Sequence, residues 1–344
     1  LGLLAEAIAA HGRALDLQPD RAGAHFHLGL ALLQAGELER GWRHYAWRFR
    51  KSPPSRLCAA VAAPPPEAAS LADGPVLVVG EQGLGDMLQF LRYVPAAWER
   101  NPALRLCLPA SLHALARSSG LPCPLLTPEQ AETTTDATIV PLMALPLQLG
   151  QATVPPHPAQ PWLRVPEQRR RHWQQRLRSG LGPSQRLLGL HWQGNPDVER
   201  IQHRGRSLPL ELLAPLAGLA GVRLLSLQRG HGEEQWRHCS FRAAFVEGQE
   251  EIDQIRDFVE VGAMASACDL IISSDSALVH LAGGLDLPTW LLLKRVPDWR
   301  WGLQGERTAW YPSLRLFRQS HAGDWDGPIH LLLEALRAAG PTLL

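Results

Sequence analysis

Residues 80–86 have the types and spacing that point most directly to chemistry. The apolar run Val76–Val79 leads into the glycine-rich sequence GEQGLGD, and an amphipathic stretch follows through Trp98. This pattern predicts a buried strand, a glycine loop containing Gly83 and Gly85, and a helix that begins beside a carboxylate. Such loops usually attract anions, because glycine allows close approach and a helix start presents unpaired N–H groups. Asp86 repels phosphate there, so its carboxylate is better suited to accepting a proton from a hydroxyl.

A second segment, residues 269–283, predicts a buried strand that ends in serines and continues into a helix. Asp275 or Ser276 can cap this helix, and the amides of Ser276 and Ala277 then point toward a bound diphosphate. His280, one turn into the helix, can donate a hydrogen bond to the same anion. Alternatively, His280 is a core histidine satisfied by backbone.

A third segment joins the strand and polar turn of residues 189–196, which include Asn195, to a basic loop at residues 203–209. Arg204 and Arg206 in that loop can stabilise negative charge on a leaving phosphate without a metal. A solvated charged loop is the alternative interpretation.

Two further residues give weaker signals. Gln228 follows another predicted strand and indicates the same anion site. Glu260, at a predicted helix start, can hold ribose hydroxyls, although a carboxylate at that position is favourable for the helix itself. No Lys-Ser/Thr pair follows the first glycine loop, and its glycine spacing is not that of the dinucleotide fingerprint.

Composition excludes several classes of protein. The 344 residues carry 34 basic and 33 acidic side chains, so the net charge of +1 does not favour a nucleic-acid binder. The five cysteines lack metal-ligand spacing, and no apolar run reaches the roughly 18 residues of a membrane span. We therefore expect reduced thiols, a cytoplasmic location and no metal. The chain starts mid-helix without Met, which predicts an upstream N-terminus.

The elements that must position these residues fall into an α-helical part and an α/β part. In residues 1–50, small and aromatic residues such as Gly29, Gly41 and Tyr45 fit the phase of a tetratricopeptide repeat of about 34 residues. An ordinary two-helix hairpin is the alternative. Residues 51–73 form a Pro-rich linker.

Beyond residue 74, strands and helices alternate in two series. Predicted strands lie at 76–79, 104–108, 138–140, 187–191, 223–228, 245–246, 270–273, 289–293 and 314–317. Predicted helices include 85–98, 110–118, 167–178 and 326–338. We expect two facing, doubly wound α/β domains at 74–165 and 166–325, with a ligand cleft between them and a closing helix, 326–344, that crosses back to the first.

Several segments together carry a family resemblance. They are Glu81-Gln82-Gly83-Leu84-Gly85-Asp86, Gly194-Asn195-Pro196, Arg206-Ser207-Leu208-Pro209, Asp275-Ser276 with His280-Leu281-Ala282-Gly283, and Pro297-Asp298-Trp299-Arg300-Trp301. Together they resemble the tetratricopeptide-fused bacterial form of glycosyltransferase family 9, the heptosyltransferase-like enzymes. Many relatives have Thr or Gly in place of Ser276. Relatives often carry a hydroxyl residue where Val261 stands, which weakens a ribose role for Glu260.

The resemblance implies a GT-B fold and an inverting, metal-independent transfer of a sugar from a nucleotide sugar to a hydroxyl. Asp86 matches the family's general base and Arg206 a contact to the donor phosphate. Asp275, Ser276 and His280 match the segment that binds the donor diphosphate. No cofactor is implied beyond the nucleotide-sugar substrate.

The acceptor and some alternatives to catalysis stay open. Repeat arrays usually bind peptides, which favours a protein acceptor over a lipid-linked or polysaccharide one. A non-catalytic scaffold with a degenerate transferase domain and a nucleotide-sugar epimerase on the same fold are the competing interpretations.

Overall fold

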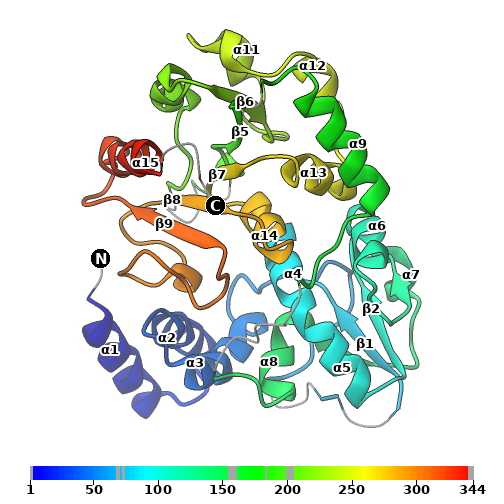
Figure 1. The fold of residues 1–344 in the computed structure, drawn as a ribbon. Helices are drawn as coiled ribbons and strands as arrows, with labels where there is room; N and C mark the ends of the chain where they lie inside the picture. The colour runs from blue at the N-terminus through cyan, green and yellow to red at the C-terminus, as the bar shows by residue number, and fades with distance from the viewer. Residues whose placement is uncertain are drawn as a thin grey trace. The chain divides into compact units, whose positions relative to one another are not determined.

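The protein forms two compact units, one of which takes in a short segment from late in the chain. The computed structural model describes residues 3–66, 70–71, 74–153, 161–182, 184–197, 199 and 205–339. Unit 1 comprises Leu1–Trp162 and Asp298–Leu303, and unit 2 comprises Leu163–Pro297 and Gln304–Leu344. Figure 1 colours the ribbon by residue number, so the residues of each unit can be followed there. We call residues 298–303 the strap.

Unit 1 begins with helices packed closely through glycine. They are α1 (Leu4–Leu17), α2 (Ala22–Gln34), α3 (Leu38–Tyr45) and the 3-10 turn η1 (Ala46–Phe49). A Cβ added at Gly29 would lie 2.6 Å from the Tyr45 nitrogen, and one at Gly41 would lie 2.8 Å from the Leu33 side chain. Only glycine allows α2 and α3 this approach, so the predicted small positions are confirmed. Their assignment to a tetratricopeptide repeat stays a prediction.

A parallel sheet follows in unit 1. Its strands are β1 (Val76–Val79), β2 (Leu104–Cys107), β3 (Leu125–Leu126) and β4 (Thr138–Pro141), in the order β3-β2-β1-β4. The chain builds β2 and β3 on one side of β1 and then places β4 on the other. The order therefore reverses at β1, and ligands of such sheets bind beyond the carboxyl ends of strands at this point.

The helices of unit 1 show one departure from the sequence pattern. The continuous helix predicted at 85–98 is divided into α4 (Leu84–Phe90), the 3-10 turn η2 (Leu91–Tyr93) and α5 (Val94–Arg100). Pro95 has no N–H group to donate to an α-helical bond. It lies in the first turn of α5, where an N–H group would have no acceptor within the helix. The other helices and 3-10 turn are α6 (Ala110–Ser118), α7 (Pro128–Glu132), η3 (Leu142–Ala144) and α8 (Leu145–Gln148).

Unit 2 contains the second parallel sheet. Its strands are β5 (Arg186–His191), β6 (Val222–Ser226), β7 (Leu270–Ser274), β8 (Thr289–Leu293) and β9 (Leu314–Arg318), in the order β6-β5-β7-β8-β9. The strand order reverses between β5 and β7, which are parallel neighbours with His191 in register with Ser273. The strand predicted at 245–246 is reduced to an isolated bridge between Leu224 and Phe245.

Helices and 3-10 turns complete unit 2. They are α9 (Glu167–Arg178), η4 (Leu210–Gly218), α11 (Gln235–His238), η5 (Arg242–Ala244), α12 (Gln249–Ile252), α13 (Phe258–Ala265), α14 (Ala277–Gly284) and α15 (Asp326–Ala338). In α15, the residues Ile329, Leu332 and Leu336 are buried with Phe317 in one hydrophobic cluster. Their helical spacing gives α15 an apolar face that packs into unit 2.

The domains expected from sequence stay a prediction, and the compact units are drawn differently. The helical segment and the Pro-rich segment fall in unit 1. The expected closing helix, α15, belongs to the core of unit 2, and the late segment included in unit 1 is the strap, with its 3-10 turn η6 (Trp299–Trp301). The boundary at Trp162 and Leu163 lies close to the expected one. Among the described helices, none is long and apolar enough to cross a membrane.

Candidate functional site

The glycine loop of unit 1 fixes Asp86 in the first turn of α4. Gly83 is the N-cap residue, and its backbone N–H donates to Asp86 Oδ2 over 2.9 Å. Gly85 lies in the same turn. Gln82 adopts a left-handed conformation with φ of 61°, which is uncommon outside glycine. The side chain of Asp86 remains 21% exposed, so a carboxylate oriented by backbone still reaches the surface of the unit.

The other oxygen of Asp86 is paired with the strap. Arg300 donates from its terminal nitrogen to Asp86 Oδ1 and from Nε to Gln89 Oε1. A second terminal nitrogen donates to Asp298 Oδ1 over 2.8 Å. Burial alone would lower the pKa of Arg300, but the charges of Asp298 and Asp86 outweigh it and raise that pKa. Arg300 is therefore a permanent buried cation beside the candidate base.

Helical residues hold the glycine loop from its other end. Arg48 of η1 donates to both carboxylate oxygens of Glu81, each over 2.7 Å, and Glu81 also accepts from the Met143 N–H over 3.0 Å. The Gln82 amide donates to the Tyr45 hydroxyl over 2.7 Å. Burial raises the pKa of Tyr45 to about 12. The helical segment and the loop that carries Asp86 are thus one polar assembly.

In unit 2, the predicted helix start after β7 is present. Ser276 is the N-cap residue of α14, is 6% exposed, and makes no side-chain capping bond. Ala277 begins the helix, and Asp275 is partly buried before it. The side chain of His280 is buried, with Nδ1 2.6 Å from the Tyr311 hydroxyl. The alternative interpretation, a core histidine bonded to backbone, expects a different partner from this hydroxyl. The contact of His280 with a ligand stays a prediction.

Arg206 lies over the polar turn that follows β5. A Cβ added at Gly194 would lie 2.7 Å from Arg206 Nε, so the glycine makes room for the guanidinium. Arg206 Nε is 3.6 Å from the Glu199 carboxylate and, among the described residues, is buried without a hydrogen-bond partner. Asn195 is exposed and accepts from the Asp197 N–H over 2.9 Å. Arg204 lies outside the described residues.

His191, at the end of β5, is a candidate that the sequence pattern did not single out. It is 9% exposed, and its Nδ1 is buried without a hydrogen-bond partner in the described part of the chain. Burial lowers the pKa of His191 to about 3, and the nearby charges of Arg206 and Arg229 act in the same direction. The imidazole is thus neutral, next to cations at the carboxyl edge of the sheet. Its position as the last residue of a strand at the reversal point was the available signal.

Gln228 and Arg229 have structural partners that account for their polar groups. Gln228 Oε1 accepts from the N–H groups of Trp192 and Gln193 over 3.0 and 3.1 Å. Its amide donates to the carbonyls of Gln193 and His231. Gln228 therefore orders the turn beneath Arg206, and its predicted contact with a donor would require giving up these bonds.

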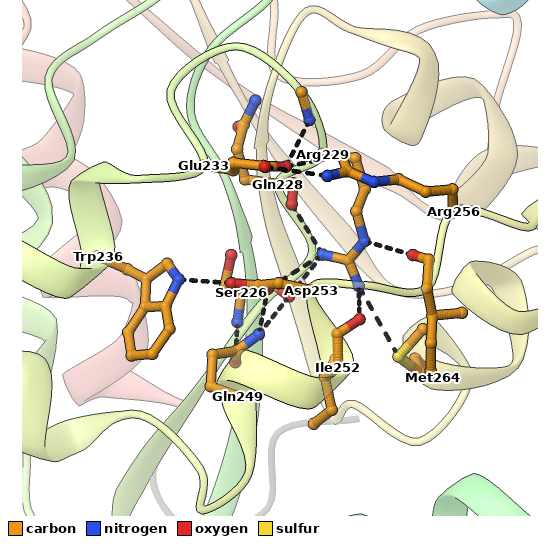
Figure 2. Close-up of polar contacts among 12 residues, drawn as sticks. Ser226, Gln228, Arg229, Glu233, Trp236, Gln249, Ile252, Asp253, Arg256 and Met264 are labelled. Atoms are coloured by element: carbon orange, nitrogen blue, oxygen red, sulfur yellow. Dashed lines mark hydrogen bonds and ion pairs between the residues drawn. The ribbon is translucent and has the colours of Figure 1, made fainter.

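Figure 2 shows how Arg229 is held. Its guanidinium donates to the carbonyls of Ile252, Ile255 and Gln228 over 3.0, 2.8 and 2.7 Å. Asp253 lies beside it and accepts from Gln249 over 2.8 Å. Burial lowers the pKa of Arg229 and raises that of Asp253. This network joins the loop after β6 to α12.

Glu260 pairs with α9. Arg169 donates to its two carboxylate oxygens, each over 2.6 Å, and the Trp173 indole donates over 2.6 Å. Burial alone would raise the pKa of Glu260, but the bonds from Arg169 and Trp173 lower it. These contacts fix α13 against α9, and the predicted ribose contact would compete with them.

The candidates thus divide between the units. Unit 1 carries Asp86 with its glycine loop, and unit 2 carries Ser276, Ala277, His280, Asn195 and Arg206 around the ends of β5 and β7. Within the described residues, no three His, Cys, Asp or Glu side chains form a group able to hold a metal ion. The metal independence of the chemistry stays a prediction.

Comparison with known proteins gives a sequence relative and several solved structures, two of which are described below. No family model matches the chain. Over 168 residues it is 31% identical to Protein FlbA of Caulobacter vibrioides, covering 48% of this chain and 27% of FlbA. The chain therefore spans well under two thirds of that relative.

The ADP-heptose lps heptosyltransferase II of E. coli matches with a TM-score of 0.54 and 16% identity, over 77% of this chain and 98% of that one. The glycosyl transferase family 9 structure from Veillonella parvula DSM 2008 matches with a TM-score of 0.53 and 13% identity, over 80% and 98%. The chain shares the α/β fold of these structures, with parallel sheets.

Proposed function

We propose that the protein is a glycosyltransferase of the family 9 type, which moves a sugar from a nucleotide sugar to a hydroxyl. The observation that carries this proposal is where the candidates lie in the two sheets. Asp86 follows β1, the Arg206 side chain lies over the turn after β5, and Ser276 follows β7. These are the strands at which the strand order reverses, where ligands of open parallel sheets bind. In this proposal unit 1 supplies the base for the acceptor, and unit 2 binds the donor.

The reaction is a single displacement with inversion. The acceptor hydroxyl oxygen forms a bond to the anomeric carbon while the bond from that carbon to the phosphate oxygen breaks. The hydroxyl proton passes to Asp86, and the nucleotide diphosphate leaves with the bonding electrons. A carboxylate fixed by a backbone N–H is suited to accept this proton.

The donor phosphates bind in unit 2. The first N–H groups of α14, which have no acceptor within the helix, and the guanidinium of Arg206 stabilise charge as it builds on the leaving phosphate. The buried Nε of Arg206 supports this assignment, because it has no hydrogen-bond partner among the described residues and a buried donor needs an acceptor. With this charge compensation from the protein, we assign no metal to the step.

The test compares Asp86→Asn with wild type. Nucleotide release is measured from ADP-heptose, the donor in the name of the E. coli structure, and from GDP-, UDP- and CMP-linked sugars. We expect the variant to lose at least about 10²-fold in kcat, the scale of losing a general base. Its thermal shift with the best nucleotide should match wild type, because ligand binding raises apparent stability by mass action.

Asp136→Asn is the matched control. Asp136 is an exposed carboxylate of unit 1 paired with Arg105 on β2, so its loss should leave turnover unchanged. Full activity in Asp86→Asn would remove Asp86 from the proposed role. A changed nucleotide sugar released without acceptor would instead identify an epimerase, and no turnover of any donor by wild type would favour a scaffold. The proposed acceptor is a hydroxyl on a protein recruited by the helical segment, and intact-mass analysis of candidate proteins after reaction tests it.

A further inference from the structure

We infer that Arg300 is a positioning residue for Asp86, supplied to unit 1 by the strap. The inference rests on the proposed function, because it gives the base of that reaction its orientation. Asp86 and Arg300 are 214 residues apart in sequence, and the ion pair joins the first turn of α4 to η6.

The guanidinium of Arg300 is fixed from three directions. Its side chain is 6% exposed and bonds Asp86, Gln89 and Asp298 with different nitrogens. Gln89 lies three residues after Asp86 in α4, so Arg300 contacts two side chains one turn apart on that helix. A planar fork with five donors can serve three acceptors in this way, whereas a lysine ammonium cannot reproduce the geometry.

Aromatic contacts hold the strap in place. The Arg300 guanidinium lies 4.4 Å from the ring centre of Trp299, whose ring in turn meets Trp42 of α3 edge-on at 5.2 Å. Trp42 also contacts Phe90 at the end of α4. Asp298 caps η6 by accepting from the Arg300 N–H over 3.2 Å. The strap is therefore packed against the helical segment and α4 together.

These contacts leave Asp86 oriented and still able to act. Oδ1 accepts from Arg300 and Oδ2 from the Gly83 N–H, while a carboxylate offers about four lone-pair sites. The two bonds fix the plane of the carboxylate, and its remaining lone pairs can meet a hydroxyl on the exposed side. Such preorganisation raises kcat rather than affinity for the donor.

The decisive variant is Arg300→Gln, assayed by nucleotide release from ADP-heptose or whichever sugar nucleotide of the panel wild type turns over fastest. We expect kcat to fall about 10²-fold, the cost of misplacing a reactive group, with donor KM within about twofold of wild type. A role only in stability leaves kcat unchanged at a temperature where the protein is folded.

Two further variants cover a failure to fold. Arg300→Lys keeps a cation, and we expect about tenfold loss of kcat because a point charge cannot bond all three acceptors. The double variant Asp298→Asn with Arg300→Gln also removes the charge that Arg300 neutralises at Asp298, and it should match Arg300→Gln in kcat. Arg105→Gln, which breaks the more exposed pair with Asp136 in the same unit, is the matched control and should behave as wild type.

The outcomes separate this inference from the proposed function. Wild-type kcat in Arg300→Gln or Arg300→Lys, together with an inactive Asp86→Asn, would overturn the role of Arg300 alone. An active Asp86→Asn would overturn the proposed function itself. Loss of kcat in both Asp86→Asn and Arg300→Gln, with donor KM retained, supports both.

Discussion

Arg48 and Glu81 form a doubly hydrogen-bonded ion pair with side chains that are 2% and 0% exposed. Arg48 lies in η1 and Glu81 in the glycine loop, so the pair joins the helical segment to the loop that carries Asp86. Burial lowers the pKa of an arginine, but here the charge and bonds of Glu81 outweigh it and raise the pKa of Arg48. The helical segment is thus an internal support of the candidate site.

Breaking this pair on one side should be costly. We expect Arg48→Met or Glu81→Gln to lower the free energy of unfolding by about 3–5 kcal/mol, because the remaining charge is left buried and unpaired. The double variant Arg48→Met with Glu81→Leu should lose less than the sum of Arg48→Met and Glu81→Leu measured singly. Urea unfolding of the four variants and wild type measures these values. Purely additive losses would show that the two side chains do not interact.

His191 should make stability depend on pH. Its pKa is about 3 in the folded chain against 6.5 for an ordinary histidine, so between these values the unfolded state binds the proton and the folded state does not. The contribution of His191 to the free energy of unfolding is therefore fully present above pH 6.5 and is lost as the pH falls from 6.5 towards 3. Between pH 7 and 5 the loss should be about 2 kcal/mol, from 1.36 kcal/mol per pH unit.

The measurement is urea unfolding of wild type and His191→Gln across that range. The variant should lose about 2 kcal/mol less than wild type on acidification, whatever its stability at pH 7. Parallel pH dependences in the two proteins would contradict the assignment.

Gly283 should not tolerate a side chain. A Cβ there would lie 2.2 Å from the Tyr311 ring, which also bonds His280. We expect Gly283→Ala to destabilise by about 1–3 kcal/mol through overpacking. Gly23→Ala in α2 is the control, because nothing lies within 4 Å of its added Cβ and alanine favours a helix. Thermal unfolding should lower the Tm of the first variant and raise or preserve that of the second.

Arg206 should act on the donor. We expect Arg206→Gln to lower kcat/KM for the nucleotide sugar by about 10²-fold, since it removes one charged contact to the leaving phosphate. Arg242→Gln, which breaks an exposed pair with Glu250 in the same unit, should leave kcat/KM unchanged. Equal effects of the two substitutions would argue against a donor contact at Arg206.

The sequence predicted the strands well because their apolar runs are buried on both faces. Val76–Val79 and Thr289–Leu293 have the predicted bounds and are buried throughout. The short strand Leu125–Leu126 was missed, since two residues give no periodicity. The break near Pro95 follows from the proline itself, which the apolar pattern of residues 85–98 does not reveal. The reduction of residues 245–246 to a bridge depends on tertiary packing, which outweighs local pattern.

The site could be predicted only where a local pattern positions it. Asp86 and Ser276 follow strands directly, so chain order was enough to place them. Chain order could not reveal the cations that pair with the candidate carboxylates. Arg300 lies 214 residues from Asp86, and Arg169 lies 91 residues from Glu260. A charged residue near a helix start gives no indication of which distant cation it pairs with.

The chain leaves the second unit after Pro297, contributes six residues to the first unit, and returns at Gln304. For that reason, neither unit can be exchanged by cutting the chain at a single point. A fragment ending at Trp162 would lack the cation that partners its acidic residue, and the complementary fragment would display two tryptophans, 299 and 301, that are buried in the intact protein. Any chimaera that exchanges one half for that of another protein of this fold must therefore transplant residues 298–303 together with the first unit.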